Sequence, residues 1–289
     1  MSNMSNPITA DATNRMRNIG FVAGLAIVGS IAVIAILGPA LLAQDPFTQD
    51  LTRRLVPPAW METGRPEHWL GTDGLGRDYL ARLAYGARIS LLIGFMTTIT
   101  SGLIGTTLGV LGGYFGGRID DAVVFAITCR LSIPVVLVAL AVVGLLGSSL
   151  TLLFLTLGLL LWDRFAVVAR SATMQIRTLD YLSAARCAGC STLHLLFREV
   201  LPNIAPHLAV VATLEMALAI LAEATLSFLG LGVPPPLPSW GLMIAEGRDY
   251  MFFYSWVILI PGVALFILVL GVNLVGDGLR NWLGTERFR

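Results

Sequence analysis

Long uncharged stretches separate short polar segments along the whole chain. Residues 19–43 and 89–114 carry no charge, and residues 131–162 form an uncharged run of 32 residues. Because a helix rises 1.5 Å per residue, about 20 apolar residues are enough to cross a bilayer. The first two runs each predict one spanning helix, and the third is too long for one crossing. The 25 residues of the first run exceed the roughly 7–15 of a signal-peptide core, which predicts an uncleaved span.

The third run divides at Gly147-Ser148-Ser149, a segment typical of turns. This division predicts two helices, at 122–146 and 150–169, joined by a tight outer turn. Further apolar stretches at 206–231 and 251–275 predict a fifth and a sixth span. We therefore expect an all-α integral membrane protein with six transmembrane helices.

The polar segment 44–88 separates the first two spans. Its last residues, 78–88, place apolar side chains at helical spacing among charged ones, which predicts an amphipathic helix along the outer membrane interface. The residues of this pattern are Leu80, Leu83, Ala84 and Ala87, with Arg77, Asp78 and Arg82 among them. We expect the whole segment to be extracytoplasmic.

Composition supports a membrane location and narrows the chemistry. Hydrophobic residues make up 56% of the chain and charged residues 13%, whereas soluble domains carry about 25% charged residues. All 19 basic residues are arginine, so a Walker A lysine, a Schiff-base lysine and a lysine general base are excluded. A net charge of +1 gives no reason to expect nucleic acid as a partner. Energy from ATP would therefore have to come from another chain.

The distribution of arginine predicts the orientation. With both termini cytoplasmic, the tails 1–18 and 277–289 and the inner loops hold eleven arginines, and the outer loop before the sixth span holds only Arg248. The outer segment 44–88, with six arginines, is the exception. The cytoplasmic set is Arg15, Arg17, Arg118, Arg164, Arg170, Arg177, Arg186, Arg198, Arg280, Arg287 and Arg289.

The longest cytoplasmic loop, 170–205, predicts two short helices. Thr178 or Asp180 can cap the first helix, and Gly189 can end it in the left-handed conformation. Ser191 can cap the second, and Pro202 is expected to end it.

The first of these helices exposes small residues, which allow close approach of another protein. These residues are Ala184, Ala185 and Ala188, followed by Gly189. An ordinary helical hairpin on the membrane surface would show the same pattern, so the residues alone leave both interpretations open.

A few charges fall inside the predicted spans. A carboxylate at the bilayer centre costs roughly 2.5–3.5 kcal/mol on insertion scales, so Glu215 should face protein or a water-filled path. Glu215 and Glu223 either meet the solute or hold spans together by hydrogen bonds, and the second role is favoured. Arg130 can snorkel or pair across a subunit interface, whereas Asp163 and Arg164 are expected near the membrane interface.

Other candidate chemistry is sparse. Scattered histidines make a metal site improbable, and the CxxC at Cys187 and Cys190 lacks further zinc ligands or a thioredoxin-like context. No HExxH, GxSxG or paired intramembrane Asp occurs. We therefore predict no catalytic, metal or cofactor residues in this chain.

Five blocks of sequence resemble the permease subunits of ABC importers. Tyr181–Gly189 followed by Leu201-Pro202-Asn203 resembles their EAA loop, with Ser183 where that family has glutamate. The other blocks are similar to the C-type permeases for dipeptides, oligopeptides and nickel. They are 68–78 with 85–91, 112–120, 226–232 and 273–280.

This resemblance implies a type I ABC importer (MetI-like) permease fold with both termini cytoplasmic, in the bacterial inner membrane. The core would be 89–276, with the first span and 44–88 as additions. The partners would be a second permease, two ABC ATPases that hold ATP and Mg²⁺, an extracytoplasmic substrate-binding protein and membrane lipid. This chain would be a non-catalytic subunit.

By the same resemblance, the helix 180–189 would be the coupling helix seated in an ATPase cleft. The implied coupling residues are Asp180, Ala184, Ala185, Arg186, Gly189, Leu201 and Pro202. The expected cargo is di- or oligopeptide, with nickel chelates, glutathione or opine-like solutes as alternatives. An ion-coupled secondary transporter with Glu215 as its coupling group is a further, weaker alternative, since no inverted repeats are found.

Overall fold

The computed structural model describes residues 7–286 of the chain and the side chains of residues 19–282. Within that part the fold is helical, and its one β contact is an isolated bridge between Thr72 and Asp78. The predicted tails 1–18 and 277–289 lie partly outside the described residues. Helices α1 (Pro7–Leu41) and α11 (Trp256–Glu286) extend into both of them.

Four helices in the described part are long and apolar enough to cross a membrane. They are α1, α2 (Tyr79–Phe115), α11, and the helix that runs from Thr192 to Phe228. This last helix joins α8 (Thr192–His194), the π-helical turn η2 (Leu195–Val200) and α9 (Leu201–Phe228) without a break. Two bent helix pairs raise the number to six if each pair is one span.

The predicted third and fourth spans are each broken in the structure. The first pair, α3 (Gly117–Leu131) and α4 (Val135–Leu146), bends by 80°. The second pair, α5 (Leu150–Leu160) and α6 (Asp163–Arg177), bends by 41°. At the first break Pro134 lacks a backbone N–H and disfavours helical backbone at the residue before it, a signal that hydropathy alone does not register.

The expected separate interfacial helix at 78–88 does not form. Residues from Tyr79 onward belong to α2, which continues without interruption to Phe115. Asp78 caps this helix by accepting a hydrogen bond from the Ala81 N–H at 2.8 Å. The apolar side of the segment is buried among other helices, and even Arg82 is fully buried. The amphipathic pattern therefore reflects a protein interior, not a membrane surface.

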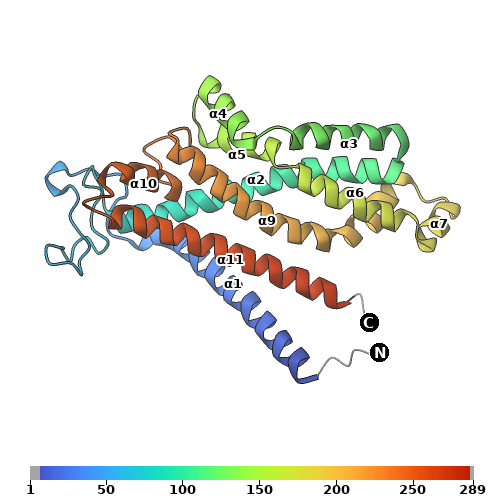
Figure 1. Cartoon of the computed structure of the whole chain (residues 1–289), viewed down its shortest axis with the longest axis horizontal. Helices are drawn as coiled ribbons and strands as arrows, with labels where there is room; N and C mark the ends of the chain where they lie inside the picture. Colours follow the sequence, from blue (N-terminus) through green and yellow to red (C-terminus); the bar gives the residue numbers. More distant parts are fainter. Residues whose placement is uncertain (1–6, 287–289) are drawn as a thin grey trace.

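Helix α2 is the centre of the bundle and packs on α1, α5, α6 and α9. Its closest neighbour is α6, which it meets through a glycine at every fourth position. A Cβ on Gly105, Gly109 or Gly113 would overlap the backbone oxygens of Trp162, Ala166 or Arg170. Helices α1 and α11 pair on one side of the bundle (Figure 1).

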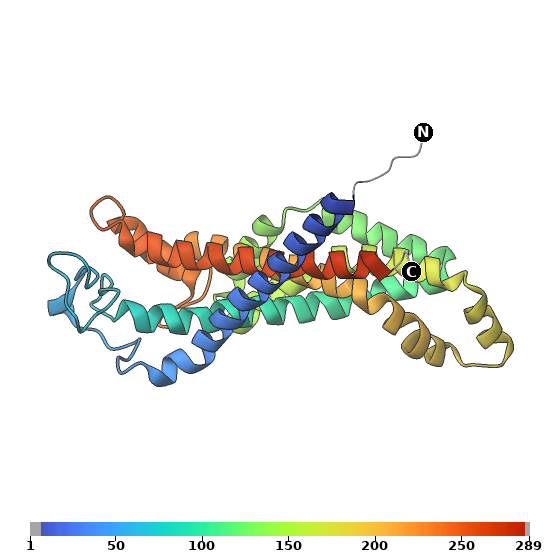
Figure 2. The ribbon, with the colours of Figure 1, turned by 90° about the horizontal axis from the view of Figure 1, so that it is seen from below.

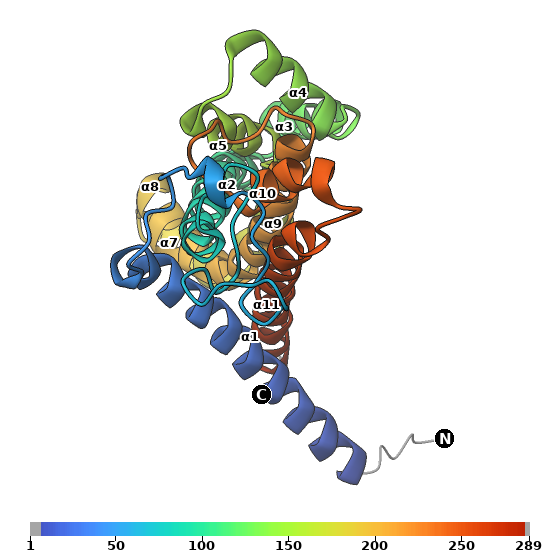
Figure 3. The same cartoon turned by 90° about the vertical axis from the view of Figure 1, so that its left-hand side faces the viewer.

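The elongated bundle separates two polar ends. The irregular segment 42–78 and α10 (Trp240–Gly247) lie at one end, and α7 (Asp180–Cys187) lies at the other (Figures 1 and 2). Seen from the first end, α1 and α4 lie on opposite sides of α2 (Figure 3). The predicted outer segment and the predicted coupling loop are thus at opposite ends of the molecule.

Candidate functional site

Helix α7 is fastened to the bundle by one leucine. Leu182 is fully buried in an apolar cluster that includes Tyr114 of α2 and Ala169 of α6. Ala185 is half-buried against the same cluster. The Arg186 guanidinium lies 4.9 Å from the centre of the Tyr114 ring, within the range of a cation–π contact. The helix is therefore held at both its centre and its end.

The ends of α7 and α8 confirm two predicted caps and correct two others. Gly189 has a φ of +85°, and Ser191 accepts a hydrogen bond from the His194 N–H at 3.4 Å. Neither Thr178 nor Asp180 caps α7, because Leu179 occupies that position and makes no side-chain cap. Pro202 does not end a helix but lies in the first turn of α9, within a longer continuous helix.

The residues predicted for coupling divide into two groups. Asp180, Ala184, Arg186 and Gly189 are exposed at the tip of the molecule. Ala185 was expected to be exposed, but it is half-buried, because it faces the Leu182 cluster together with the half-buried Leu201. The first group offers a surface to a partner, and the second connects that surface with the bundle.

A cavity of about 400 Å³ lies beside α7, between α6 and α9. Its polar wall includes Ser171, Gln175, Asn203 and His207. The Asn203 amide donates to the Glu199 carbonyl at 2.5 Å. Burial and the nearby Glu199 carboxylate raise the pKa of the Tyr181 phenol, which therefore stays neutral at physiological pH.

Arg130 pairs within the chain rather than across a subunit interface. Its Nε contacts the Asp163 carboxylate at 3.0 Å and also donates to the Leu160 carbonyl. Asp163 is buried at 5% exposure, so its carboxylate faces protein, and its predicted depth near the membrane interface stays a prediction. The Leu160 carbonyl sits where α5 ends, so Arg130 supplies a donor to backbone that the helix break leaves without its usual partner.

The two glutamates of α9 occupy different surroundings. Glu223 is fully buried, and its Oε1 accepts hydrogen bonds from Ser227 and Ser239, both at 2.7 Å. Ser239 also caps α10, so Glu223 connects α9 with α10 as a packing residue. Glu215 is 1% exposed and pairs with Arg164, whose Nε lies 3.3 Å from Oε1.

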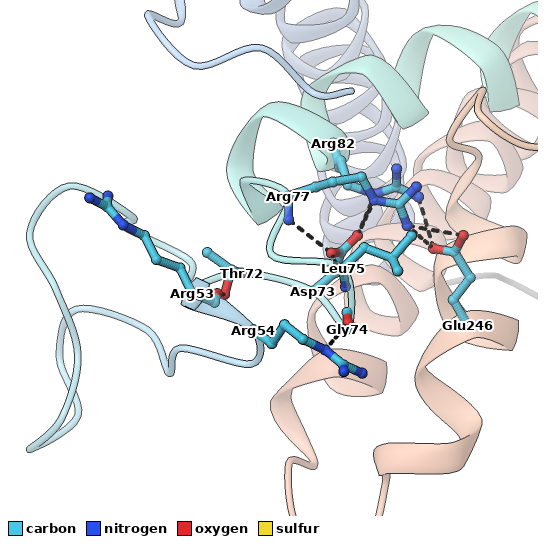
Figure 4. A network of polar contacts seen from close by, with 9 residues as sticks. All are labelled: Arg53, Arg54, Thr72, Asp73, Gly74, Leu75, Arg77, Arg82 and Glu246. Carbon is cyan, nitrogen blue, oxygen red and sulfur yellow. Dashed lines mark hydrogen bonds and ion pairs between the residues drawn. The ribbon is translucent and has the colours of Figure 1, made fainter. Parts of the chain in front are cut away.

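A buried network of four charges joins the outer segment to α10 (Figure 4). Asp73 contacts Arg77 at 2.5 Å and Arg82 at 3.2 Å. The Glu246 carboxylate contacts the same two arginines, at 3.1 Å and 2.8 Å. Sequence reasoning missed this network because Glu246 is 164 residues from Arg82. The spacing of Asp73 and Arg77, i and i+4, was the only local signal.

The three cysteines and the candidate metal ligands form no further site among the described residues. Cys129, Cys187 and Cys190 are exposed free thiols. Within the described part of the chain, no group of three or more His, Cys, Asp or Glu side chains is placed to hold a metal ion.

Comparison with known families identifies the chain as a membrane component of a transport system. Residues 105–287 match the family described as binding-protein-dependent transport system inner membrane component, and residues 15–58 match the N-terminal TM domain of oligopeptide transport permease C. The chain belongs to the first of these families and is a multi-pass membrane protein.

Named relatives cover almost the whole chain. The dipeptide transport system permease protein DppC of Haemophilus influenzae is 40% identical over 270 residues, which are 93% of this chain and 92% of that protein. The di/tripeptide transport system permease protein DppC of Pseudomonas aeruginosa is 41% identical over 269 residues, which are 93% and 89% of the two chains.

Solved structures agree on the fold. A chain of the MetNI methionine ABC transporter in an inward-facing conformation aligns with a TM-score of 0.55 at 21% identity. The alignment covers 68% of this chain and 93% of that one. The MetI-like permease fold expected from the sequence is therefore confirmed.

Proposed function

We propose that this protein is a permease subunit of an ATP-binding-cassette importer for di- and oligopeptides. The observation that carries the proposal is identity of about 40% to dipeptide permeases over 93% of the chain. Such a subunit forms part of the path and carries out no bond chemistry. The proposed topology has six spans, counting each bent pair as one, with both termini cytoplasmic in a bacterial inner membrane.

The proposed assembly contains a second permease, two ATPases and an extracytoplasmic binding protein. ATP and Mg²⁺ would be bound by the ATPases, in keeping with a chain that has no lysine for a P-loop. The binding protein would dock at the end formed by 42–78 and α10, and the ATPase at α7. The opposite placement of these two ends supports this arrangement.

The coupling mechanism follows from how α7 is held. Asp180, Ala184, Arg186 and Gly189 would contact the ATPase, while Ala185 and Leu201 pack on the cluster that joins α7 to α9. Pro202 is exposed in the first turn of α9. Because Leu182 is locked among side chains of α2, α6 and α9, displacement of α7 moves those helices together. ATP-driven movement of the ATPases would thereby shift the bundle between inward- and outward-facing states.

Substitution of Ala184 tests the docking of α7. Ala184→Trp adds a large ring to an exposed position that does not touch the Leu182 cluster, so folding should persist while docking fails. We expect peptide uptake by the reconstituted complex, and ATPase stimulation by the loaded binding protein, to fall roughly tenfold or more. Ala184→Ser, a small replacement at the same position, should retain both activities.

Two results would contradict the proposal. Normal uptake by Ala184→Trp would mean that the exposed side of α7 is not the docking surface. A wild-type complex that imports nickel chelates, glutathione or opine-like solutes but no peptide would contradict the cargo. Uptake that persists without the ATPases would instead favour an ion-coupled transporter.

A further inference from the structure

The charged side chain of Arg164 is exposed on the surface of this chain, far from either end of the bundle. Arg164 is the second residue of α6, directly after the break that follows α5, and its side chain is 57% exposed. Its partner Glu215 lies midway along α9, which runs from Leu201 to Phe228. In a membrane-spanning bundle this is mid-depth, where a guanidinium facing lipid costs roughly 2.5–3.5 kcal/mol. The exposed side of Arg164 therefore faces water or another protein chain.

The Arg164–Glu215 pair has unused hydrogen-bonding groups that a further ligand could contact. Glu215 uses Oε1 for Arg164, and its Oε2 has no hydrogen-bond partner among the described residues although it is buried. A guanidinium has five N–H donors, and this ion pair engages it through Nε. An unsatisfied buried carboxylate oxygen is costly, and a ligand that donates hydrogen bonds would satisfy it.

Polar positions continue from the pair toward the α7 end. Ser171 lies seven residues beyond Arg164 on α6, about 10 Å along the helix, and His207 lies eight residues before Glu215, about 12 Å along α9. Both residues line the cavity of about 400 Å³ beside α7. Since α6 and α9 pack on each other, the Arg164–Glu215 pair and the cavity lie along the same surface formed by these two helices.

The ion pair matches the two ends of a free peptide. Guanidinium groups bind carboxylates by two parallel hydrogen bonds, and carboxylates accept from ammonium groups. Exchange of the Arg164–Glu215 pair for one contact to a solute carboxylate and one to a solute ammonium replaces one ion pair by two, and the loss of the internal pair offsets part of the gain. Such a site binds well enough to admit a solute and weakly enough to release it, as a path requires.

We propose that Arg164 and Glu215 form a transit site for peptides with free termini, in which Arg164 binds the α-carboxylate and Glu215 the α-ammonium. This inference rests on the proposed function and adds to it a place on the path and a substrate class. Arg164 is the exposed member, so it meets the solute first. When its guanidinium turns to the solute, the buried Glu215 becomes accessible.

The test measures peptide transported per ATP hydrolysed by the complete complex in proteoliposomes. The binding protein is saturated with an unblocked radiolabelled dipeptide, and the variants are Arg164→Gln, Glu215→Gln and the double variant. We expect ATPase stimulation by the loaded binding protein to persist while peptide per ATP falls about tenfold in all three. Glu223→Gln is the matched control on the same helix, because the Glu223 Oε2 is also unpartnered but its Oε1 binds two serines and no arginine. This variant should leave the ratio of peptide to ATP unchanged.

The outcomes separate a transit site from a structural contact. If the pair only holds α6 against α9, the double variant retains an amide–amide hydrogen bond and transports at the wild-type ratio, which would overturn the proposal. A proportional fall of transport and ATPase activity in the variants would overturn it as well. Absence of peptide uptake by the wild-type complex would instead contradict the proposed function.

Discussion

At the scale of single residues, two ion pairs among the described residues connect charges of different helices. Arg130 of α3 pairs with Asp163 of α6, and Arg164 of α6 pairs with Glu215 of α9. Such pairs contribute little net stability compared with apolar packing, but the loss of one member leaves a buried charge without compensation. Their value is that they specify which helices meet, and at what depth.

The outer charge network gives a prediction at this scale. Glu246→Ala removes a carboxylate from both Arg77 and Arg82, and Arg82 is fully buried. We expect a loss on the order of 2 kcal/mol, because the 30% exposure of the Glu246 side chain moderates the cost of a broken buried pair. The midpoint of thermal unfolding in detergent would measure it.

A neighbouring carboxylate provides the control for this measurement. The Asp249 side chain is 78% exposed and lies 3.7 Å from Arg248, which is 59% exposed. Asp249→Ala should leave the unfolding midpoint within error of the wild type. Equal midpoints for the two variants would show that the network does not stabilise the outer end.

At the scale of elements, the contact between α2 and α6 positions both the proposed transit site and the proposed coupling helix α7. The glycine stripe of α2 lets the α6 backbone approach closely, and α6 carries Arg164 and leads directly to α7. The Asp120 carboxylate of α3 contacts Arg170 of α6 at 2.6 Å, which adds a polar contact to the same region. A change in the spacing of these helices should therefore act on transport and coupling together.

Substitution of Gly109 tests this close approach. A Cβ at Gly109 would overlap the Ala166 carbonyl oxygen, whereas a Cβ at Gly144 in α4 would have no heavy atom within 4 Å among the described residues. Gly109→Ala should destabilise the subunit by about 1–3 kcal/mol through overpacking, and Gly144→Ala should not. Thermal unfolding and co-purification of the second permease would both report the difference. Equal stability of the two variants would mean that the α2–α6 contact can relax.

At the scale of the whole molecule, the bundle has two polar ends, which the proposed topology assigns to the outer side and to the side of the ATPases. The arginine distribution predicts that the α7 end is cytoplasmic, and the structure places the segment 42–78 at the opposite end (Figure 1). A transporter needs this separation because its binding protein and its motor act on different sides of the membrane. The topology can be tested without any transport assay.

The exposed cysteines of the α7 end make this test direct. With Cys129→Ser in place, a membrane-impermeant maleimide should label Cys187 and Cys190 in inside-out vesicles that lack the ATPases, and not in intact spheroplasts. In a variant that lacks the native cysteines, Thr48→Cys, in the exposed outer segment, should show the reverse pattern. Labelling of the α7 cysteines in spheroplasts would contradict the proposed orientation and indicate the opposite one.

Much of the element order was predictable because apolar length and arginine placement are local properties. The uncharged runs identified the spanning regions, and Gly189 and Ser191 identified ends of short helices. The interfacial helix at 78–88 was predicted wrongly because helical periodicity shows that one side of a helix is buried, but it does not show whether lipid or protein buries it. The 80° bend between α3 and α4 was missed because the spans were assigned from hydropathy, which does not register the proline at position 134.

The sequence by itself determined that this chain crosses a membrane and has no lysine for a P-loop, and it predicted the left-handed backbone that the structure has at Gly189. Only the tertiary structure decided that Asp73, Arg77, Arg82 and Glu246 form one network, and that Arg164 covers one oxygen of Glu215 and leaves the other unpaired. The physical reason is the separation along the sequence of the residues that interact. Hydropathy and helix caps depend on residues a few positions apart, whereas buried ion pairs depend on which helices pack together, and that is a property of the whole bundle.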